Sequence, residues 1–149
     1  MRKYLPIIFL LLFAASTFAA ESGMNPAGAA FVKAVNAQDA DGIAALYDAD
    51  SILFPPDTMV LKGHDAIRQS WVELFKTYTA HIEGSDGFFE IKGNLSYSWG
   101  QFTMTLTPKA GGEPMKIEGR YSDVSKMEHG KWYYIVDHAS APLPPPPSK

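Results

Sequence analysis

The sequence contains no cysteine among its 149 residues, so disulfide bonds cannot stabilise the fold. A domain without disulfides depends on its hydrophobic core. About 130 residues follow the N-terminal segment discussed below, which is enough chain for one domain with one core. We therefore expect a single domain whose stability comes from packing.

Runs of basic residues are also absent. The chain has 13 Lys and Arg residues against 16 Asp and Glu. Without Arg2 and Lys3 the count is 11 against 16, a net charge of 11 − 16 = −5. An acidic surface repels the phosphate backbone, so we expect no nucleic-acid partner.

Several catalytic and cofactor motifs are missing as well. The 4 histidines are scattered, and none is paired at the four-residue spacing of a helical metal site. The serines at 96, 98 and 122 lack the Gly-x-Ser-x-Gly turn of many serine hydrolases, and there is no glycine loop for phosphate. We expect no metal and no cofactor.

The first twenty residues have the pattern of a signal peptide. Arg2 and Lys3 precede an apolar stretch from Leu5 to Phe13, and small residues follow up to a cleavage site before Ala20 or Glu21. The apolar stretch is shorter than the roughly 20 residues of a membrane span. The segment therefore predicts export to the periplasm or the medium, with no stable membrane anchor after cleavage.

Helical periodicity occupies the first half of the remaining chain. Asn25 and Pro26 open a first helix, and the polar stretch 38–42 separates it from a second that continues through Tyr47, with Asp39 or Asp41 as N-cap. A short strand is expected at 51–54. Residues 66–78 carry apolar side chains on one face, which predicts a third helix.

The second half has a period of two residues. Strands are expected at 88–92, 95–106, 115–126 and 131–139, separated by turn-forming residues. Helices followed by antiparallel strands indicate an α+β fold with helices on one face of a curved sheet. The boundaries are then a signal peptide at 1–20, a domain at 21–140 and a proline-rich tail at 141–149.

Four stretches together resemble a known family. The stretches 31–47 (FVKAVNAQDADGIAALY), 62–67 (KGHDAI) and 119–124 (GRYSDV), with Gly130-Lys131-Trp132, are similar to the SnoaL-like and ketosteroid-isomerase-like branch of the nuclear-transport-factor-like superfamily. The resemblance implies a cystatin-like cone of three helices on a strongly bent antiparallel sheet. It also implies a pocket open at one end and a homodimer.

The resemblance does not carry the isomerase chemistry with it. Ketosteroid isomerases use a tyrosine on the first helix, an aspartate base on the following strand and a second acid. Alignment with that pattern puts Phe31 at the tyrosine, Phe54 or Pro55 at the base and Ser122 at the second acid. Phe and Pro cannot transfer protons, which argues against steroid isomerisation by that mechanism.

The last predicted strand supplies the leading candidate residues. Asp137 and His138 interrupt an apolar and aromatic run, and a buried charge requires a partner or a ligand. Adjacent strand residues face opposite sides of a sheet, so a single pocket cannot contain both without a bulge. The resemblance implies that Tyr133, Ile135 and Asp137 face the interior and that Tyr134, Val136 and His138 face outward.

Parity on the preceding strand puts Arg120, Ser122 and Val124 on one face, which we expect to be the interior one. Arg120 could then pair with Asp137 as a purely structural ion pair. Alternatively, Asp137 is a general base and Arg120 binds a carboxylate or enolate. His138 is either a third acid or base, or a hydrogen-bonded interface residue.

Aromatic and apolar side chains are predicted to line the pocket wall, with the reservation that each could equally be ordinary core. The expected ligand-binding residues are Tyr47, Phe54, Trp71, Tyr97, Trp99, Ser122 and Ile135.

Three functions fit these observations. The first is binding of a small, largely apolar molecule in the pocket. The second is an isomerase, cyclase or dehydratase with Asp137 as base. The third is a dimerising interaction module of the cell envelope, which contacts its partner through a groove or the proline tail. The sequence leaves these three open.

Overall fold

The protein was analysed as a computed structural model that describes residues 21–56 and 59–142. The predicted signal peptide and most of the proline-rich tail lie outside this range. Within it, helices are too short or too polar to span a membrane.

Three helices form where the sequence has apolar spacing, and two of them begin at a side-chain cap. Helix α1 (Pro26–Asn36) begins after Asn25, whose side chain accepts a hydrogen bond from the Gly28 amide, and Pro26 occupies the first turn. Helix α2 (Ala40–Ala44) is capped in the same way by Asp39, which decides between the two predicted caps. Helix α3 (Gly63–Thr77) begins three residues before its predicted start.

Seven strands form one sheet in the order β1-β4-β5-β6-β7-β2-β3. All neighbouring pairs are antiparallel except β2 and β7, which run parallel. A parallel pair needs a long connection, and here α3 and four strands lie between the two in the chain. The bounds are β1 Glu21–Ser22, β2 Tyr47–Phe54, β3 Leu61–Lys62, β4 Tyr78–Lys92, β5 Leu95–Pro108, β6 Met115–Glu128 and β7 Lys131–Ser140.

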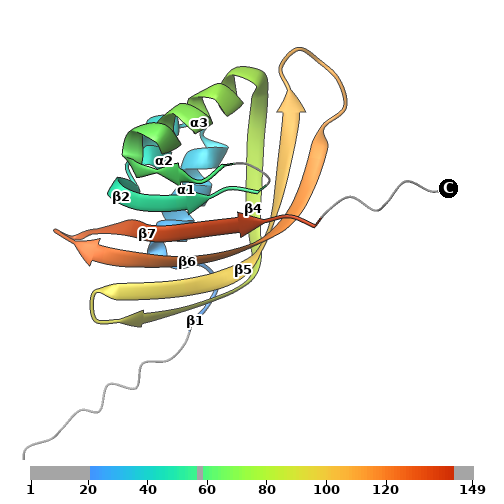
Figure 1. Ribbon diagram of the computed structural model, residues 1–149. Helices are drawn as coiled ribbons and strands as arrows, with labels where there is room; N and C mark the ends of the chain where they lie inside the picture. The colour runs from blue at the N-terminus through green and yellow to red at the C-terminus, as the bar shows by residue number, and fades with distance from the viewer. Residues whose placement is uncertain (1–20, 57–58, 143–149) are drawn as a thin grey trace, which may run out of the picture.

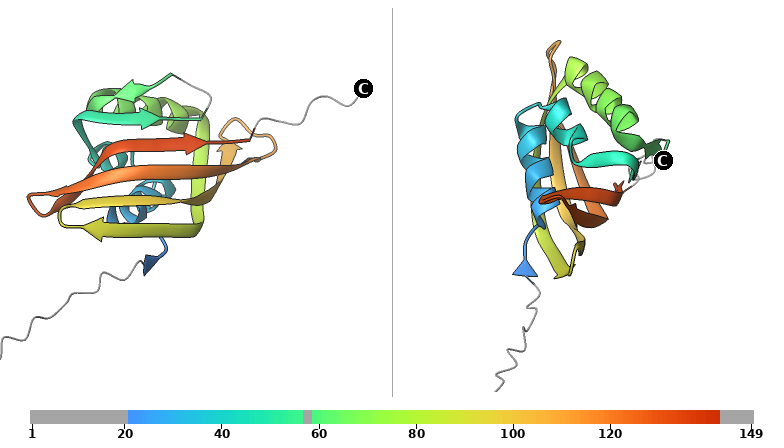
Figure 2. Two further views of the ribbon diagram at one scale, coloured as in Figure 1. Left: turned by 60° about the horizontal axis from the view of Figure 1, so that its bottom comes forward. Right: turned by 90° about the vertical axis from the view of Figure 1, so that its left-hand side faces the viewer.

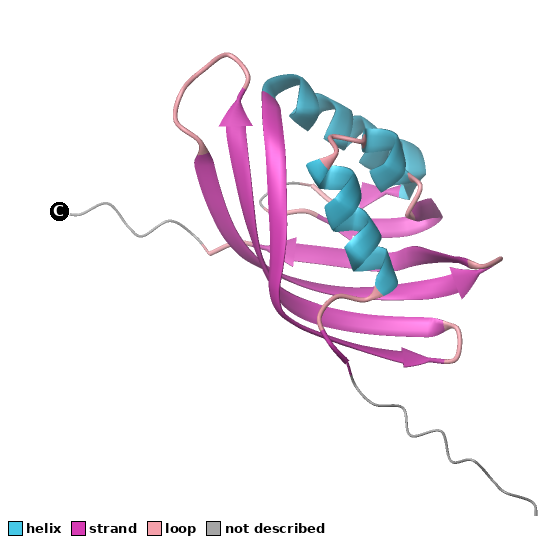
Figure 3. Ribbon diagram, turned by 180° about the vertical axis from the view of Figure 1, so that it is seen from behind, coloured by secondary structure: helices cyan, strands magenta, loops and turns pink. Residues whose placement is uncertain are grey.

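The sheet is curved and holds the helices in its hollow. Figures 1 and 3 show β4, β5 and β6 bending as they pass the helices, while α1 and α3 lie on the concave side. The side view in Figure 2 shows the helices on one side of the sheet only. The predicted α+β class, with three helices on a strongly bent sheet, is confirmed.

Several element boundaries differ from the sequence prediction, most of all those near Tyr47 and at the start of β4. Tyr47 was expected in the second helix, but α2 ends at Ala44 and Tyr47 is the first residue of β2. The apolar spacing continued through Tyr47 because its side chain is buried in the same core. Strand β4 begins at Tyr78 rather than at 88, since Gly84 and Gly87 interrupt its alternation at the bend.

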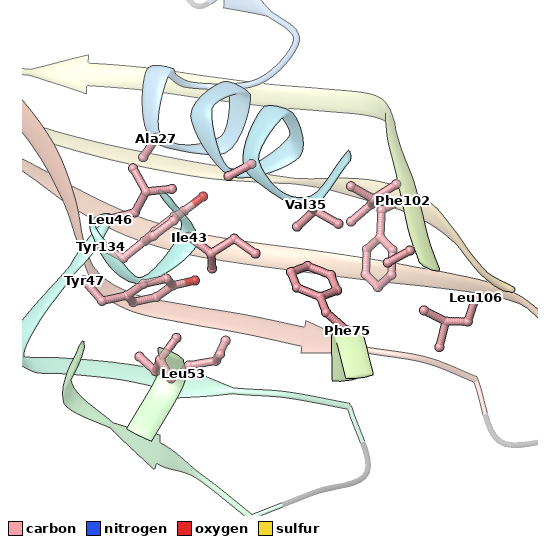
Figure 4. Close-up of a cluster of buried hydrophobic side chains, with 14 residues drawn as sticks. Ala27, Val35, Ile43, Leu46, Tyr47, Leu53, Phe75, Phe102, Leu106 and Tyr134 are labelled. Carbon is pink, nitrogen blue, oxygen red and sulfur yellow. The ribbon is translucent and has the colours of Figure 1, made fainter. Parts of the chain in front are cut away.

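The hydrophobic core lies between α1, α2, α3 and the concave face of the sheet. Val35, Ile43 and Ile67 are fully buried. Figure 4 shows the rings of Tyr47 and Tyr134 lying one over the other, and their centroids are 5.0 Å apart. Burial of such side chains contributes roughly 2 kcal/mol each, so this layer fixes the helices on the sheet.

Strand β7 contains one extra residue. Val124 pairs with Val136, but the next residue of β6, Ser125, pairs with Tyr134, so Ile135 has no partner on β6. Ile135 is 40 % exposed, whereas Tyr134 and Asp137 are both buried. The bulge therefore reverses the alternation of β7 at Ile135.

Candidate functional site

A cavity of about 780 Å³ opens between the helices and the concave face of the sheet. Phe31 and Val32 of α1 and Trp71 and Leu74 of α3 form its helical wall. The sheet contributes Tyr121, Asp123, Tyr134 and Asp137, among other residues. This size and mainly apolar wall are typical of small-molecule sites.

Two buried carboxyl groups lie side by side on the sheet wall. Asp123 of β6 and Asp137 of β7 are direct partners in the antiparallel pair, and both line the cavity. Direct partners on one face have Cβ atoms roughly 5 Å apart. Asp123 is 4 % exposed and Asp137 is 9 % exposed. Solvent therefore screens the repulsion between the two carboxylates only weakly.

Asp123 is fixed by two donors. The Asn25 side-chain amide donates to its Oδ1 at 2.8 Å, and the Ser98 hydroxyl donates to its Oδ2. Asn25 cannot turn its amide round, because its Oδ1 already accepts from the Gly28 amide at 2.7 Å. Burial raises the pKa of Asp123 to about 6, while the bonds from Ser98 and Asn25 favour its ionised form and limit that rise.

Asp137 has fewer hydrogen-bond donors around it than Asp123 has. The Tyr47 hydroxyl donates to its Oδ2 at 2.7 Å, and no described residue donates to Oδ1. Burial raises the pKa of Asp137 to about 7; the Tyr47 bond opposes this rise and the nearby Asp123 carboxylate adds to it. Burial also raises the pKa of Tyr47 well above its usual value, so Tyr47 remains a donor.

The two carboxyl groups therefore favour different protonation states. Both oxygens of Asp123 accept hydrogen bonds, an arrangement that suits a carboxylate. Asp137 has one oxygen without a partner among the described residues and is the better place for a proton. Near neutral pH a proton on this pair therefore lies mainly on Asp137.

Tyr121 also lines the cavity. Its hydroxyl is buried and has no hydrogen-bond partner among the described residues. The ring passes close to Gly100, where an added Cβ would come within 2.7 Å of the hydroxyl. Glycine at that position therefore makes room for the Tyr121 side chain.

The prediction that Arg120 faces the interior is wrong. Arg120, Ser122 and Val124 do share a face, as parity required, but it is the outer face of β6. Arg120 is exposed, and the predicted ion pair with Asp137 does not form. Tyr47 is the hydrogen-bond partner of Asp137 instead.

Most of the other predicted residues also lie outside the cavity. Phe54, Tyr97, Trp99, Ser122 and His138 line a shallow hollow on the outer face of the sheet. Asp137 and His138 face opposite sides, as predicted.

The bulge accounts for the errors on β7. Tyr133 and Ile135 were expected inside and Tyr134 outside, but Tyr134 is 3 % exposed and lines the cavity. Ile135 lies on the surface. Of the predicted ligand-binding residues, Trp71 lines the cavity and Tyr47 is buried behind Asp137.

The sequence interpretation missed Asn25, Ser98, Tyr121 and Asp123. On β5 the small residues Ser96, Ser98 and Gly100 face inward and the large Tyr97 and Trp99 face outward. Tyr97 and Trp99, which the sequence predicts in the pocket wall, therefore lie on the opposite face. The glycines at 100 and 119 were the available signal, because glycine in a strand often marks a close approach of other atoms.

Asp123 also corrects the comparison with ketosteroid isomerases. The alignment put Ser122 at the second acid and suggested that no acid was present there, but the next residue, Asp123, faces the cavity. Phe31 and Pro55 do line the cavity, so a tyrosine and a base remain absent at those two positions. The described residues contain no cluster of metal-binding side chains.

Solved structures share this architecture. A candidate calcium/calmodulin-dependent protein kinase II association domain from Xanthomonas campestris has 23% identity and a TM-score of 0.69, over 84% of this chain and 96% of its own. A candidate scytalone dehydratase from Novosphingobium aromaticivorans has 11% identity and a TM-score of 0.72, over 78% and 80%.

A ketosteroid isomerase-like protein from Erwinia carotovora atroseptica has 20% identity and a TM-score of 0.66, over 79% of this chain and 92% of its own. At these identities the likeness concerns the fold alone. No curated protein matches the sequence.

A family model agrees with both the fold and the sequence resemblance. The model of the SnoaL-like domain matches residues 29–135, which run from α1 into β7 and include most of the cavity wall. The chain therefore belongs to the SnoaL-like domain family.

Proposed function

We propose that this protein binds a small, largely apolar molecule in the cavity, with a polar atom of the ligand against Asp137. The observation that carries the proposal is the Asp137 carboxyl group, which lines an apolar cavity and has one oxygen without a protein donor. This oxygen is not among the described polar atoms that are closed off from solvent without a partner, so it is open to the cavity. A donor group on a ligand can therefore reach it and form a hydrogen bond to the carboxyl group.

The two carboxyl groups differ in hydrogen bonding and in pKa, and this difference favours acid–base chemistry as a second candidate function. A carboxyl group whose pKa is raised to about 7 can both accept and donate a proton near neutral pH. Asp137 would be the group that exchanges protons, and Asp123 would stay ionised beside it. Relatives of this fold include candidate dehydratases and an isomerase-like protein, which makes an isomerase, cyclase or dehydratase the reaction class to test.

The binding proposal can be tested with native mass spectrometry and thermal-shift measurements against a panel of apolar metabolites. Ser70 lies at the mouth of the cavity on α3, whereas the neighbouring Gln69 is exposed and does not line it. We expect Ser70→Trp to abolish ligand retention and ligand-induced stabilisation, and Gln69→Trp to preserve both. Equal binding by the two variants would contradict the proposed site.

The catalytic candidate requires a separate experiment. Once a ligand is known, turnover should be lost in Asp137→Asn while the ligand still binds, because the amide cannot accept a proton. His138→Asn is the matched control, since His138 follows in sequence but faces the outer side of the sheet. Undiminished turnover in Asp137→Asn would remove Asp137 from the mechanism.

The outer face of the sheet is a separate part of the proposal. Phe54, Tyr97, Trp99 and Ile135 are between 38% and 54% exposed there. The resemblance implies a homodimer, and we propose that this aromatic face forms its interface in an exported protein. Its use in capturing another envelope protein, the third function considered from the sequence, is the competing proposal.

A further inference from the structure

The charge on the cavity wall restricts the ligands that it can accept. Asp123 and Asp137 are its two buried ionisable acids, and among the described residues the lining has one basic side chain, Lys116. Lys116 lies at the exposed start of β6, where its Nζ is 2.8 Å from Glu118 Oε1. The described protein therefore supplies no cation to neutralise the buried acids.

Buried carboxylates are normally paired with a cation or are protonated. Asp123 keeps its charge through the hydrogen bonds from Asn25 and Ser98. Asp137 receives a single hydrogen bond, from Tyr47. A carboxylic or phosphate group on a ligand would add a third negative charge at this place, so anionic ligands are disfavoured.

Aromatic side chains from the helical wall and from the sheet wall meet in this cavity. Phe31 lies edge-on to Trp71, with ring centroids 5.5 Å apart, and edge-on to Tyr134, with centroids 6.4 Å apart. All three residues line the same cavity as the two carboxyl groups. Aromatic faces attract organic cations, and the attraction is strongest where water is excluded.

Tyr121 adds a further aromatic ring beside the two acids. It belongs to the same strand as Asp123 and lines the cavity, while its hydroxyl is closed off from solvent. The cavity therefore combines carboxyl acceptors on the sheet wall with aromatic rings around them.

We propose that the ligand of this cavity is an apolar amine, whose ammonium group lies against Asp137 and Asp123 with the aromatic residues Phe31, Trp71 and Tyr134 around it. The inference rests on the proposed small-molecule function and names the chemical class of its ligand. The ammonium group supplies the cation that the protein lacks, and one of its N–H donors forms a hydrogen bond to Asp137 Oδ1.

The groups that face Asp137 determine how binding depends on pH. They are Asp123 and Tyr121 on β6, Tyr47 on β2 and Tyr134 on β7 itself. The tyrosines have raised pKa values and stay neutral near neutral pH. The two aspartates are therefore the groups that titrate, and amine binding should strengthen as pH rises through their range.

A matched pair of ligands separates charge from shape. We would measure the binding of 4-phenylbutylamine and 4-phenylbutan-1-ol to the full chain by isothermal titration calorimetry. At about pH 8, where both acids are ionised, we expect the amine to bind at least about tenfold more tightly. Near pH 5 the preference should fall to about twofold or less, because both acids are then largely protonated.

Substitutions test whether the preference for the amine over the alcohol depends on the proposed residues. Asp137→Asn should remove most of the amine preference at about pH 8 and leave the affinity for the alcohol within about twofold. Asp123→Asn offers a second variant should the first fold poorly. Glu128→Gln, which removes an exposed acid at the end of β6, should leave the preference unchanged.

The outcomes distinguish this inference from the function on which it rests. Tighter binding of the amine that depends on Asp137 would support both. Equal or tighter binding of the alcohol at about pH 8 would overturn the amine inference and leave the binding function standing. Binding of neither ligand would count against the binding function and the inference together.

Discussion

In strands β5, β6 and β7 the face covered by the helices has many polar groups, and the uncovered face has large aromatic side chains. In an ordinary sheet the covered face is the apolar one. The inner face has serine, glycine, aspartate and tyrosine hydroxyl groups beneath the helices, while large aromatic side chains such as Trp99 lie on the outer face. Neighbouring residues can thus have very different chemistry: Asp137 is buried in a cavity and His138 is exposed. Position relative to the sheet, rather than residue type, selects the candidate site.

The largest expected effect concerns the inner face and pH. The pKa values of Asp137 and Asp123 are raised to about 7 and about 6, from ordinary values near 4. Between those limits the folded state binds more protons than the unfolded state, so the free energy of unfolding decreases as pH rises. The loss attributable to Asp137 is roughly 4 kcal/mol at most between pH 4 and 8.

Asp137→Asn should therefore unfold at a higher temperature than the parent at about pH 8. Its stability should also depend less on pH across this range. Calorimetric scans at several pH values measure both effects, with the exposed Glu128→Gln as control. A pH slope that Asp137→Asn leaves unaltered would show that this carboxyl group is not the source.

The next effect concerns the support of Asp123. Asn25→Ala removes the cap of α1 and the amide donor to Asp123 together. Loss of a cap costs about 1 kcal/mol and loss of a hydrogen bond to a charged group about 2, so we expect about 3 kcal/mol in all. The measurement is chemical denaturation at neutral pH.

Asp39→Ala is the matched control, because Asp39 caps α2 through the Gly42 amide and has no contact with the buried acids. It should cost about 1 kcal/mol. If the two variants lose equal stability, the bond between Asn25 and Asp123 contributes little.

A smaller effect is expected at Tyr47. Tyr47→Phe keeps the ring stacked on Tyr134 and removes the hydrogen bond to Asp137, at a cost of about 1 to 2 kcal/mol. Because that bond favours the ionised acid, the pKa of Asp137 should rise further. Carbon-13 NMR of the aspartate carboxyl groups measures this pKa directly.

Tyr134→Phe removes a hydroxyl from the same stacked pair without removing a described hydrogen bond to Asp137. Its effect on the carboxyl titration should be much smaller. Similar shifts in both variants would mean that the Tyr47 hydroxyl has no special influence on Asp137.

The smallest effect on folding is expected on the outer face. Trp99 is 54% exposed, so Trp99→Ser should change the free energy of unfolding of the monomer by about 0.5 kcal/mol or less. If the outer face forms the proposed homodimer, the same substitution should weaken association. Sedimentation velocity over a range of concentrations would detect this, and unchanged association would move the interface elsewhere.

Much of the fold could be predicted from the sequence because helical and strand periods are local properties. Asn25 and Pro26 mark the start of α1, and the turns at 93–94 and 128–130 separate the long strands. The parallel pairing of β2 with β7 has no such local signal, since it joins segments far apart in the chain.

The candidate site was harder to predict because parity identifies which residues share a face without saying which face is buried. Arg120 and Ser122 were correctly grouped and wrongly placed. Two features determine which face of β6 points into the cavity. The start of α1 approaches β5 closely enough for Asn25 to contact Ser98, and Gly100 leaves space for Tyr121. Both are tertiary contacts, so the inward position of Asp123 followed only from the structure.

The extra residue in β7 has a consequence for the comparison of related sequences. Ile135 acts as a one-residue insertion, so the side chains before it and those after it follow opposite phases of the strand. A relative without this insertion, aligned through β7 with no gap, would appear to exchange Asp137 for a residue of the other phase. Alignments that place the gap at Ile135 keep Tyr134 and Asp137 in columns of cavity residues. Deletion of Ile135 would move the side chains on one side of it to the opposite face of the sheet.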